Sequence, residues 1–148
     1  MDYLIRNARE SDINDILSLE KQCFSMPHTR EQLVSCLDES MHVFPVAVRE
    51  DGSVLGYVEM SVVIDEGYIS NVAVAQPFRR QGIAGSLLEY LINYGIELSL
   101  SFITLEVRES NKAAISLYKN HNFKIAGFQR NYYTEPKENA IIMTRYFN

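Results

Sequence analysis

The chain has 148 residues, of which 47% are hydrophobic and 22% charged, a composition typical of a soluble protein with a single domain. Its formal net charge of −5 at pH 7 argues against a nucleic-acid-binding protein with a broad basic face. No apolar run approaches the roughly 18 residues of a membrane span, and the first residues lack the pattern of a signal peptide. We therefore expect one cytoplasmic domain over residues 1–148, with no nucleic-acid or membrane partner.

Taken in chain order, the sequence predicts strands and helices that alternate irregularly. Two helix starts carry capping residues: Ser11, and the capping-box pair Thr29 and Gln32. Asp51-Gly52 is a strong signal for a hairpin between two strands. The expected strands cover 3–7, 43–48, 54–64, 69–74, 102–107, 123–128 and 140–146, and the expected helices cover 11–22, 29–37, 83–92 and 111–119.

This order predicts the fold class. Antiparallel strands come first, and a β-α-β crossover then adds a parallel strand. We expect an α/β protein with a mixed, mostly antiparallel central sheet and helices on both faces.

The stretch over residues 69–88 predicts an anion site. A strand ends at Gln76-Pro77, because proline cannot donate to a sheet ladder, and the loop 79–85, RRQGIAG, opens directly into an amphipathic helix. A helix N-terminus offers unpaired N–H groups, and small residues let an anion approach the backbone closely. The spacing is neither a P-loop nor the dinucleotide fingerprint. Without further motifs, an exposed arginine-rich turn explains the stretch equally well.

Arg79, Gly82 and Ala84 fit the Q/R-x-x-G-x-G/A pattern of the GNAT N-acetyltransferases. In that family the matching loop binds the pyrophosphate of acetyl-coenzyme A, and the strand before it offers backbone groups to the pantetheine arm, as to an added strand. The resemblance implies acetyl-coenzyme A as co-substrate. It implies as its ligands Val72, Ala73, Val74, Arg79, Arg80, Gln81, Gly82, Ile83, Ala84, Gly85 and Asn111, the last of which also suits a helix N-cap.

Four further motifs narrow the resemblance to one group within that family. Residues 105–118, LEVRESNKAAISLY, resemble a run in the bacterial ribosomal-protein-alanine N-acetyltransferases, the RimI type. RNYY at 130–133 and ENAIIM at 138–143 are similar to motifs of the same family, and DEGYISNVAV at 65–74 is similar to its D-E-x-x-I-x-N-I-A-V. Because these motifs stand in register over about eighty residues, the chain is identified as a member of this family, and the GNAT fold is expected.

Glu106 is a candidate general base. In its strand it shares a face with Phe102 and Thr104, and an unpaired carboxylate is costly to bury in a covered strand. An ion pair with Arg108 or Arg130, or a solvated strand end, would account for it structurally. Amine acetylation needs a neutral amine, whereas an N-terminal ammonium has a pKa of about 7.7–8.0. In the family the matching glutamate accepts that proton, which implies that Glu106 does so here.

Tyr118 is a candidate general acid. It follows Asn111 by seven residues on the next helix and so lies on the same helix face. Coenzyme A leaves as a thiolate, which a tyrosine hydroxyl can protonate, and the matching family tyrosine has that role. The alternative is a packing tyrosine, because the chain contains nine.

The chain departs from the family pattern at two places. Asn122-Phe123 stands where the family usually has G-F, and asparagine tolerates the left-handed conformation that ends a helix. Pro27-His28-Thr29 stands where the family often has P-W-[ST], near the expected acceptor groove. His28 is either a second titrating group or a solvent-exposed loop residue.

The resemblance implies an acetyl-coenzyme A-dependent N-acetyltransferase that modifies a protein N-terminus, the N-terminal alanine of a small-subunit ribosomal protein, by direct attack in a ternary complex without a metal. Cys23 and Cys36 lack metal-ligand spacing and are expected to be small buried side chains. The alternatives are a related enzyme acting on a polyamine, amino-sugar or amino acid, and a non-catalytic coenzyme A-binding module. Tyr132-Tyr133 favours a peptide groove, and the presence of both Glu106 and Tyr118 favours an enzyme.

Overall fold

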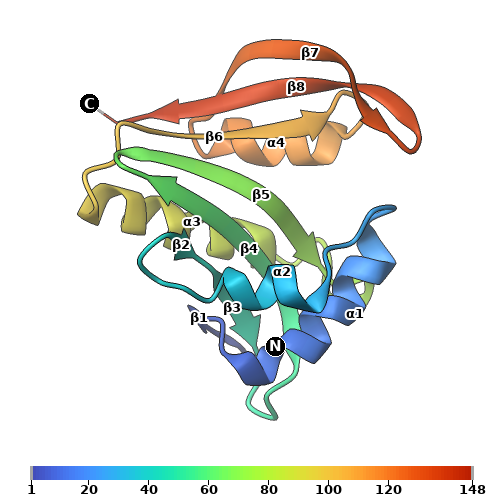
Figure 1. Cartoon of the computed structure of the whole chain (residues 1–148), viewed down its shortest axis with the longest axis vertical. Helices are drawn as coiled ribbons and strands as arrows, with labels where there is room; N and C mark the ends of the chain where they lie inside the picture. The colour runs from blue at the N-terminus through green and yellow to red at the C-terminus, as the bar shows by residue number, and fades with distance from the viewer. Residues whose placement is uncertain (1, 148) are drawn as a thin grey trace.

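The computed structural model describes residues 2–147, which form an eight-stranded sheet in the order β1-β3-β4-β5-β6-β8-β7, with β2 paired to β4 (Figure 1). The strands are β1 (Leu4–Asn7), β2 (His42–Val43), β3 (Pro45–Val48), β4 (Val54–Val63), β5 (Glu66–Val74), β6 (Phe102–Arg108), β7 (Lys124–Thr134) and β8 (Lys137–Tyr146). The helices are α1 (Ile13–Cys23), α2 (Arg30–Ser35), α3 (Ile83–Glu97) and α4 (Lys112–Asn120), with 3-10 turns η1 (Glu10–Asp12) and η2 (Gln76–Phe78).

The parallel pair β5-β6 creates the most important feature of the sheet. Helix α3 joins these strands, and among the described strands every other pairing is antiparallel. The parallel register ends where Ile69 pairs with Leu105, although β5 continues to Val74 beside β4. Beyond this point β4 and β5 diverge from β6, β8 and β7, as Figure 1 shows. The last residues of β5 therefore have an edge without a strand partner on the β6 side.

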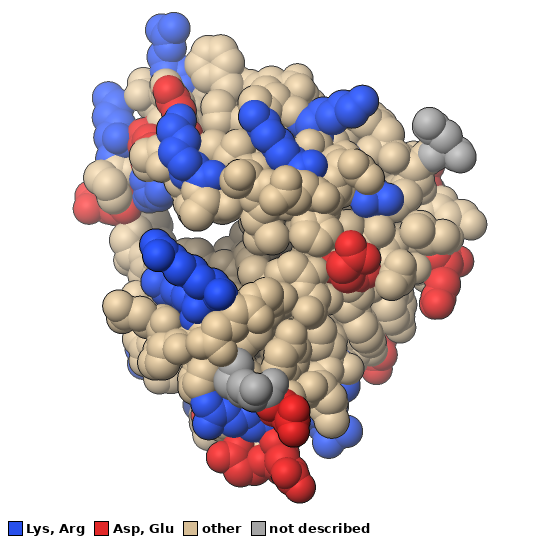
Figure 2. All heavy atoms as spheres, turned by 180° about the vertical axis from the view of Figure 1, so that it is seen from behind, with Lys and Arg blue, Asp and Glu red and all other residues tan. Residues whose placement is uncertain are grey.

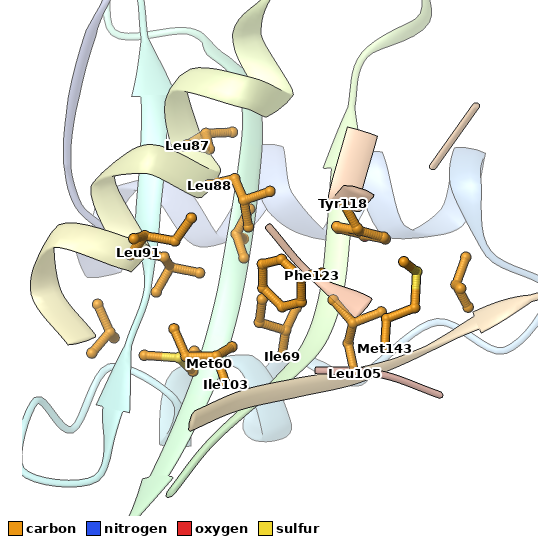
Figure 3. Close-up of a cluster of buried hydrophobic side chains, with 14 of the residues drawn as sticks. Met60, Ile69, Leu87, Leu88, Leu91, Ile103, Leu105, Tyr118, Phe123 and Met143 are labelled. Carbon is orange, nitrogen blue, oxygen red and sulfur yellow. The ribbon is translucent and has the colours of Figure 1, made fainter. Parts of the chain in front are cut away.

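The predicted amphipathic face of α3 is confirmed as the centre of the larger core. Leu87, Leu88 and Leu91 are fully buried against sheet residues such as Met60 and Ile103 (Figure 3). Helix α4 covers the same face of the sheet as α3. Its Tyr118 is buried in this core, and neighbouring residues of α4 are partly buried against it.

The opposite face of the sheet is covered by α1 and α2. Ile13, Ile16 and Leu33 pack in a second buried cluster with Phe44 and Tyr57. Helices thus cover both faces of a mixed sheet, as the sequence predicted. Within residues 2–147, no helix has the length and apolar character needed to cross a bilayer.

The first helix begins later than predicted. Ser11 lies inside the turn η1 instead of capping a helix, and Asp12 precedes α1. Asp12 is buried because its carboxylate accepts hydrogen bonds from both terminal nitrogens of Arg6, at 2.7 and 3.1 Å, and from the Arg9 backbone N–H at 2.8 Å. A residue that reads as a surface acid in the sequence therefore anchors β1 to the start of α1.

Three strand predictions also need correction. The strand expected over 43–48 is divided into β2 and β3 at Phe44, whose side chain enters the α1-α2 core. The last two strands are much longer than the expected 123–128 and 140–146, since β7 and β8 form a long hairpin. Most of β7 is exposed, so hydrophobic alternation could not reveal its length.

Three local predictions are confirmed. Thr29 and Gln32 form the capping box at α2, with N···O distances of 3.2 and 2.8 Å. Gly52 turns the β3-β4 hairpin with φ +89°, and Asn122 adopts φ +66° after α4.

Candidate active site

A cavity of about 1090 Å³ occupies the space where β5 and β6 diverge. Its lining combines the end of β5, the end of β6, the start of α3 and one side of α4. The end of α1 with the loop that follows it, through residues 23–26, and the β7-β8 hairpin, through residues 132–136, complete the lining. Arg79, Arg80 and Arg108 are the arginines among its lining residues. Figure 2 shows Lys and Arg side chains on both sides of a hollow in the face seen from behind.

The β5 residues predicted to hold the pantetheine arm lie along this cavity. Val72, Ala73 and Val74 pair with β4 on one side and follow the last parallel pair, at Ile69, on the other. On the cavity side, the backbone groups of Val72 and Ala73 are thus available to an extended ligand that adds to the sheet edge, whereas the Val74 carbonyl already accepts a hydrogen bond from Arg79.

The predicted phosphate loop is brought to the cavity by two left-handed residues. Arg80 has φ +64° and Gly82, the N-cap residue of α3, has φ +83°. The Arg79 side chain is held to the end of β5, since its Nε donates to the Val74 carbonyl at 2.9 Å. A Cβ at Gly82 would meet no atom within 4 Å, so the space over the helix start is open.

The structure places ten of the eleven predicted ligands of the co-substrate on the cavity. The exception is Gln81, which is not among the lining residues and whose side chain instead donates to the Pro77 carbonyl at 3.3 Å. Asn111 caps α4 as predicted, because its side chain accepts a hydrogen bond from the Ala114 N–H at 3.1 Å, and it also lines the cavity.

Glu106 lies on the half-buried face of β6, just beyond the last residue paired with β5. Its carboxylate accepts a hydrogen bond from the Tyr68 hydroxyl at 2.8 Å. Arg108 is turned to Glu138, at 3.2 Å, so the predicted structural alternative of an Arg108 ion pair is wrong. Within residues 2–147, no lysine, arginine or histidine forms a salt bridge with Glu106. The carboxylate is therefore available to a cationic group that enters the cavity.

Tyr118 projects from α4 and is 6% exposed. Its ring packs against Phe123, with centroids 5.7 Å apart (Figure 3). Burial and the nearby Tyr133 raise the pKa of the Tyr118 hydroxyl, which keeps the phenol protonated at neutral pH. The cavity thus presents a carboxylate from β6 and a protonated phenol from α4.

Tyr68 is a site residue that the sequence reasoning missed. It pairs with Thr104 in the parallel register, and Glu106 is two residues further on the same face of β6. A correct strand register would have brought the two side chains together, but the motifs alone gave no reason to select Tyr68.

The two segments that rim the cavity contact each other. The Ser25 hydroxyl in the α1-α2 loop donates to the Glu135 carbonyl in the β7-β8 hairpin at 2.7 Å. The adjacent Tyr132 and Tyr133 rings pack edge to face at 5.0 Å, and burial raises the pKa of Tyr133 to about 12. The cavity is bridged on this side and lined by aromatic rings.

His28 lies in the loop before α2, but its side chain is only 35% exposed and is held by a buried carboxylate, so it is not a free solvent-exposed loop residue. Its backbone N–H donates to Glu20 Oε1 at 2.8 Å, and its ring Nδ1 lies 3.1 Å from the same oxygen. Glu20 is fully buried, and its other oxygen accepts hydrogen bonds from the Tyr57 hydroxyl and from the Asn71 amide. The loop before α2 is therefore fixed to the sheet through a buried carboxylate.

The chain matches the model of the acetyltransferase (GNAT) family over residues 13–123. It is 33% identical over 141 residues to the ribosomal protein bS18-alanine N-acetyltransferase of Escherichia coli K12, covering 94% of each chain. It is 32% identical over 157 residues to an N-alpha-acetyltransferase of Saccharolobus solfataricus, covering 97% of this chain and 93% of that one.

The fold agrees with these relatives. The crystal structure of the ribosomal-protein-S18-alanine N-acetyltransferase from Escherichia coli matches with a TM-score of 0.89 at 31% identity, covering 98% of this chain and 94% of that one. The family expected from the sequence motifs is thus confirmed. The chain belongs to the acetyltransferase (GNAT) family and is an acetyl-coenzyme A-dependent N-acetyltransferase.

Proposed function

We propose that this enzyme transfers the acetyl group of acetyl-coenzyme A to the N-terminal α-amino group of a protein, namely the N-terminal alanine of ribosomal protein bS18, by direct attack in a ternary complex. One observation carries the proposal. Glu106 and Tyr118, from different elements, line the same cavity as the unpaired edge of β5 and the start of α3. The candidate base, the candidate acid and a surface suited to the co-substrate therefore line one cavity.

The cavity fits acetyl-coenzyme A in charge and shape. The open space over Gly82 and the flanking Arg79 and Arg80 suit a pyrophosphate at the N-terminus of α3. The edge over residues 72–74 suits the pantetheine arm, and a volume of about 1090 Å³ leaves room for an acceptor. When bound, acetyl-coenzyme A supplies the acetyl group as a thioester.

Glu106 would take the proton of the incoming amine. An N-terminal ammonium has a pKa of about 7.7–8.0, so most of it is charged at neutral pH and must be deprotonated before it attacks. Glu106 has no ion-pair partner among the described residues, and the hydroxyl of Tyr68 fixes one of its oxygens. The carboxylate is thus oriented while its charge remains available to the ammonium.

Tyr118 would return a proton to the departing sulfur. Its raised pKa means that it enters the reaction protonated, and its buried ring packs against Phe123. A phenol of this kind donates only as negative charge develops on the leaving group.

The rim of the cavity supports a peptide terminus as the acceptor. The Ser25–Glu135 bridge closes one side, so a chain end enters more readily than the middle of a segment. Tyr132 and Tyr133 offer flat apolar surface to the first residues of a peptide. The choice of the bS18 alanine is supported by the Escherichia coli relative named for that activity, which matches over 94% of both chains and has the same fold.

A peptide panel tests the acceptor. The purified enzyme is given acetyl-coenzyme A with an alanine-initiated bS18 peptide, the same peptide with a blocked N-terminus, a lysine-containing blocked peptide, spermidine and an amino-sugar. We expect release of coenzyme A only with the free alanine terminus, and mass spectrometry should place one acetyl group on the α-nitrogen. Faster turnover of spermidine or of the amino-sugar would replace the proposal with the small-amine alternative.

A further inference from the structure

We propose that Cys36, His42 and Glu59 form a binding site for a divalent transition metal of the zinc type, separate from the catalytic cavity. The three side chains come from the end of α2, from β2 and from β4, and they are not among the lining residues of that cavity. One ligand atom from each, a sulfur, a ring nitrogen and a carboxylate oxygen, lies within 4.8 Å of the other two.

The spacing of these atoms is close to what a single ion requires. Zinc binds sulfur at about 2.3 Å and nitrogen or oxygen at about 2.0–2.2 Å, so its tetrahedral ligand atoms lie roughly 3.3–3.7 Å apart. His42 Nδ1 and Glu59 Oε2 are 2.9 Å apart. Small side-chain rotations are thus enough to admit a metal among the three donors.

The donor set selects the kind of metal. A thiolate, an imidazole and a carboxylate suit zinc, whereas magnesium and calcium prefer oxygen ligands throughout. Three protein ligands leave a fourth position for water.

Burial supplies a reason for a cation at this place. Glu59 is only 5% exposed, so its carboxylate is largely removed from water. The Ser70 hydroxyl donates to Glu59 Oε1 at 2.7 Å and leaves Oε2 directed at His42. Such a hydrogen bond to the second oxygen orients a ligating carboxylate.

Cys36 is a free cysteine and is half-buried, not buried as the sequence led us to expect. Its Sγ donates a hydrogen bond to the Gln32 carbonyl at 3.3 Å. When the sulfur–metal bond forms, the S–H bond breaks and its proton passes to solvent.

The position of the site indicates a structural role. A bound ion would join the end of α2 and the short strand β2 to β4 in the middle of the sheet. Helix α2 follows the loop that rims the catalytic cavity, so the metal would hold that rim in place without contacting substrate.

Cobalt titration tests the proposal. The 148-residue protein without an affinity tag, kept reduced by a phosphine, is titrated with Co²⁺ alone. We expect one equivalent to produce the visible bands of tetrahedral cobalt together with a thiolate-to-cobalt charge-transfer band, and one equivalent of Zn²⁺ to remove both. Absence of these bands in the wild-type protein at several equivalents would overturn the proposal.

Matched variants identify the ligands. Cys36→Ser should lose the charge-transfer band, whereas Cys23→Ser, which changes the other half-buried free cysteine, should retain it. Glu59→Gln should weaken binding by at least tenfold. Zn²⁺ at a hundred times its Kd should raise the Tm of the wild type by about 5–10 °C and leave that of folded Cys36→Ser nearly unchanged. An equal rise in both proteins, or a band that disappears in Cys23→Ser instead, would contradict the assignment.

Discussion

The Tyr68 hydroxyl donates a hydrogen bond to Glu106 Oε1 at 2.8 Å, across the point where β5 and β6 separate. Burial and this hydrogen bond raise the pKa of Tyr68, so the phenol remains a donor at neutral pH. The bond therefore fixes the proposed base at the mouth of the cavity that the two strands create.

Replacing Tyr68 by Phe should lower kcat by about tenfold. A hydrogen bond to a charged group contributes about 1.5–3 kcal/mol, and its loss frees the Glu106 carboxylate to rotate away from the amine. The Kd for acetyl-coenzyme A, measured by calorimetry, should stay within about twofold, because Tyr68 is not among the residues that line the cavity. In the Glu106→Gln background the same change should have little further effect on kcat. Independent, multiplicative losses would show that Tyr68 does not act through Glu106.

Replacing Glu106 by Gln should lower kcat by about 10²–10⁴-fold, the usual contribution of a general base. Glutamine keeps the size of the side chain and still accepts the Tyr68 hydrogen bond, so the fold and the Kd for acetyl-coenzyme A should be preserved. Part of the loss should return above about pH 8, where an N-terminal amine is already neutral. Steady-state kinetics from pH 6 to pH 10 provide the measurement, and full activity at pH 7 would show that Glu106 is structural.

Sequence reasoning predicted most of the fold because the helix signals were strong. The apolar spacing of α3 and the capping box of α2 are local patterns that can be recognised from neighbouring residues in the sequence. The length of β7 and the break at Phe44 depend on pairing with distant strands, and no local pattern encodes them.

In the candidate site, too, some residues could be predicted from sequence motifs and others only from tertiary contacts. Glu106, Tyr118 and Asn111 belong to motifs with fixed spacing, so the sequence alone was enough to select them. Tyr68 meets Glu106, 38 positions away in sequence, only through strand pairing. The buried Glu20 meets His28, 8 positions away, only because the loop folds back over α1. Cys36, His42 and Glu59 are brought together in the same manner, although their spacing suggested no metal site.

Gly82→Asp should abolish the binding of acetyl-coenzyme A. The substitution places a negative side chain in the open space where the pyrophosphate is proposed to bind, and repulsion adds to the steric conflict. Gly52→Asp is a matched control, since Gly52 also has positive φ, +89° against +83°, and a Cβ there would likewise meet no atom within 4 Å. Both variants should lose similar stability in a thermal melt, but only Gly82→Asp should lose binding by calorimetry. Equal affinities of the two variants for acetyl-coenzyme A would show that its pyrophosphate does not bind at the start of α3.

Asp12→Asn should lower the free energy of unfolding by about 2 kcal/mol at pH 7, because the buried carboxylate accepts charge-assisted hydrogen bonds from Arg6. Burial favours the neutral acid, yet the bonds from Arg6 and Arg9 outweigh it and hold the pKa of Asp12 below its ordinary value. A lowered pKa contributes stability above the unfolded value of about 3.9 and loses it as pH falls through the folded pKa. Urea unfolding should thus show a gap between wild type and variant that is full at pH 6 and narrows below about pH 3.9. A gap that stays constant down to pH 3 would contradict this account.

Tyr118→Phe should lower kcat by about 10²-fold or more, with little change in Tm or in the Kd for acetyl-coenzyme A. Phenylalanine keeps the ring and its packing on Phe123, so only the proton donor is removed. If Tyr118 served only to fill the core, the change would cost at most a hydrogen bond of about 0.5–1.5 kcal/mol and would spare the rate. If it is the acid, the sulfur must leave as an unprotonated thiolate or take its proton from water, and the acid contribution is lost. Thermal melts paired with steady-state kinetics separate these cases. Phe123→Leu is the matched control, because it disturbs the same packing without removing a hydroxyl and should lower Tm more than it lowers kcat.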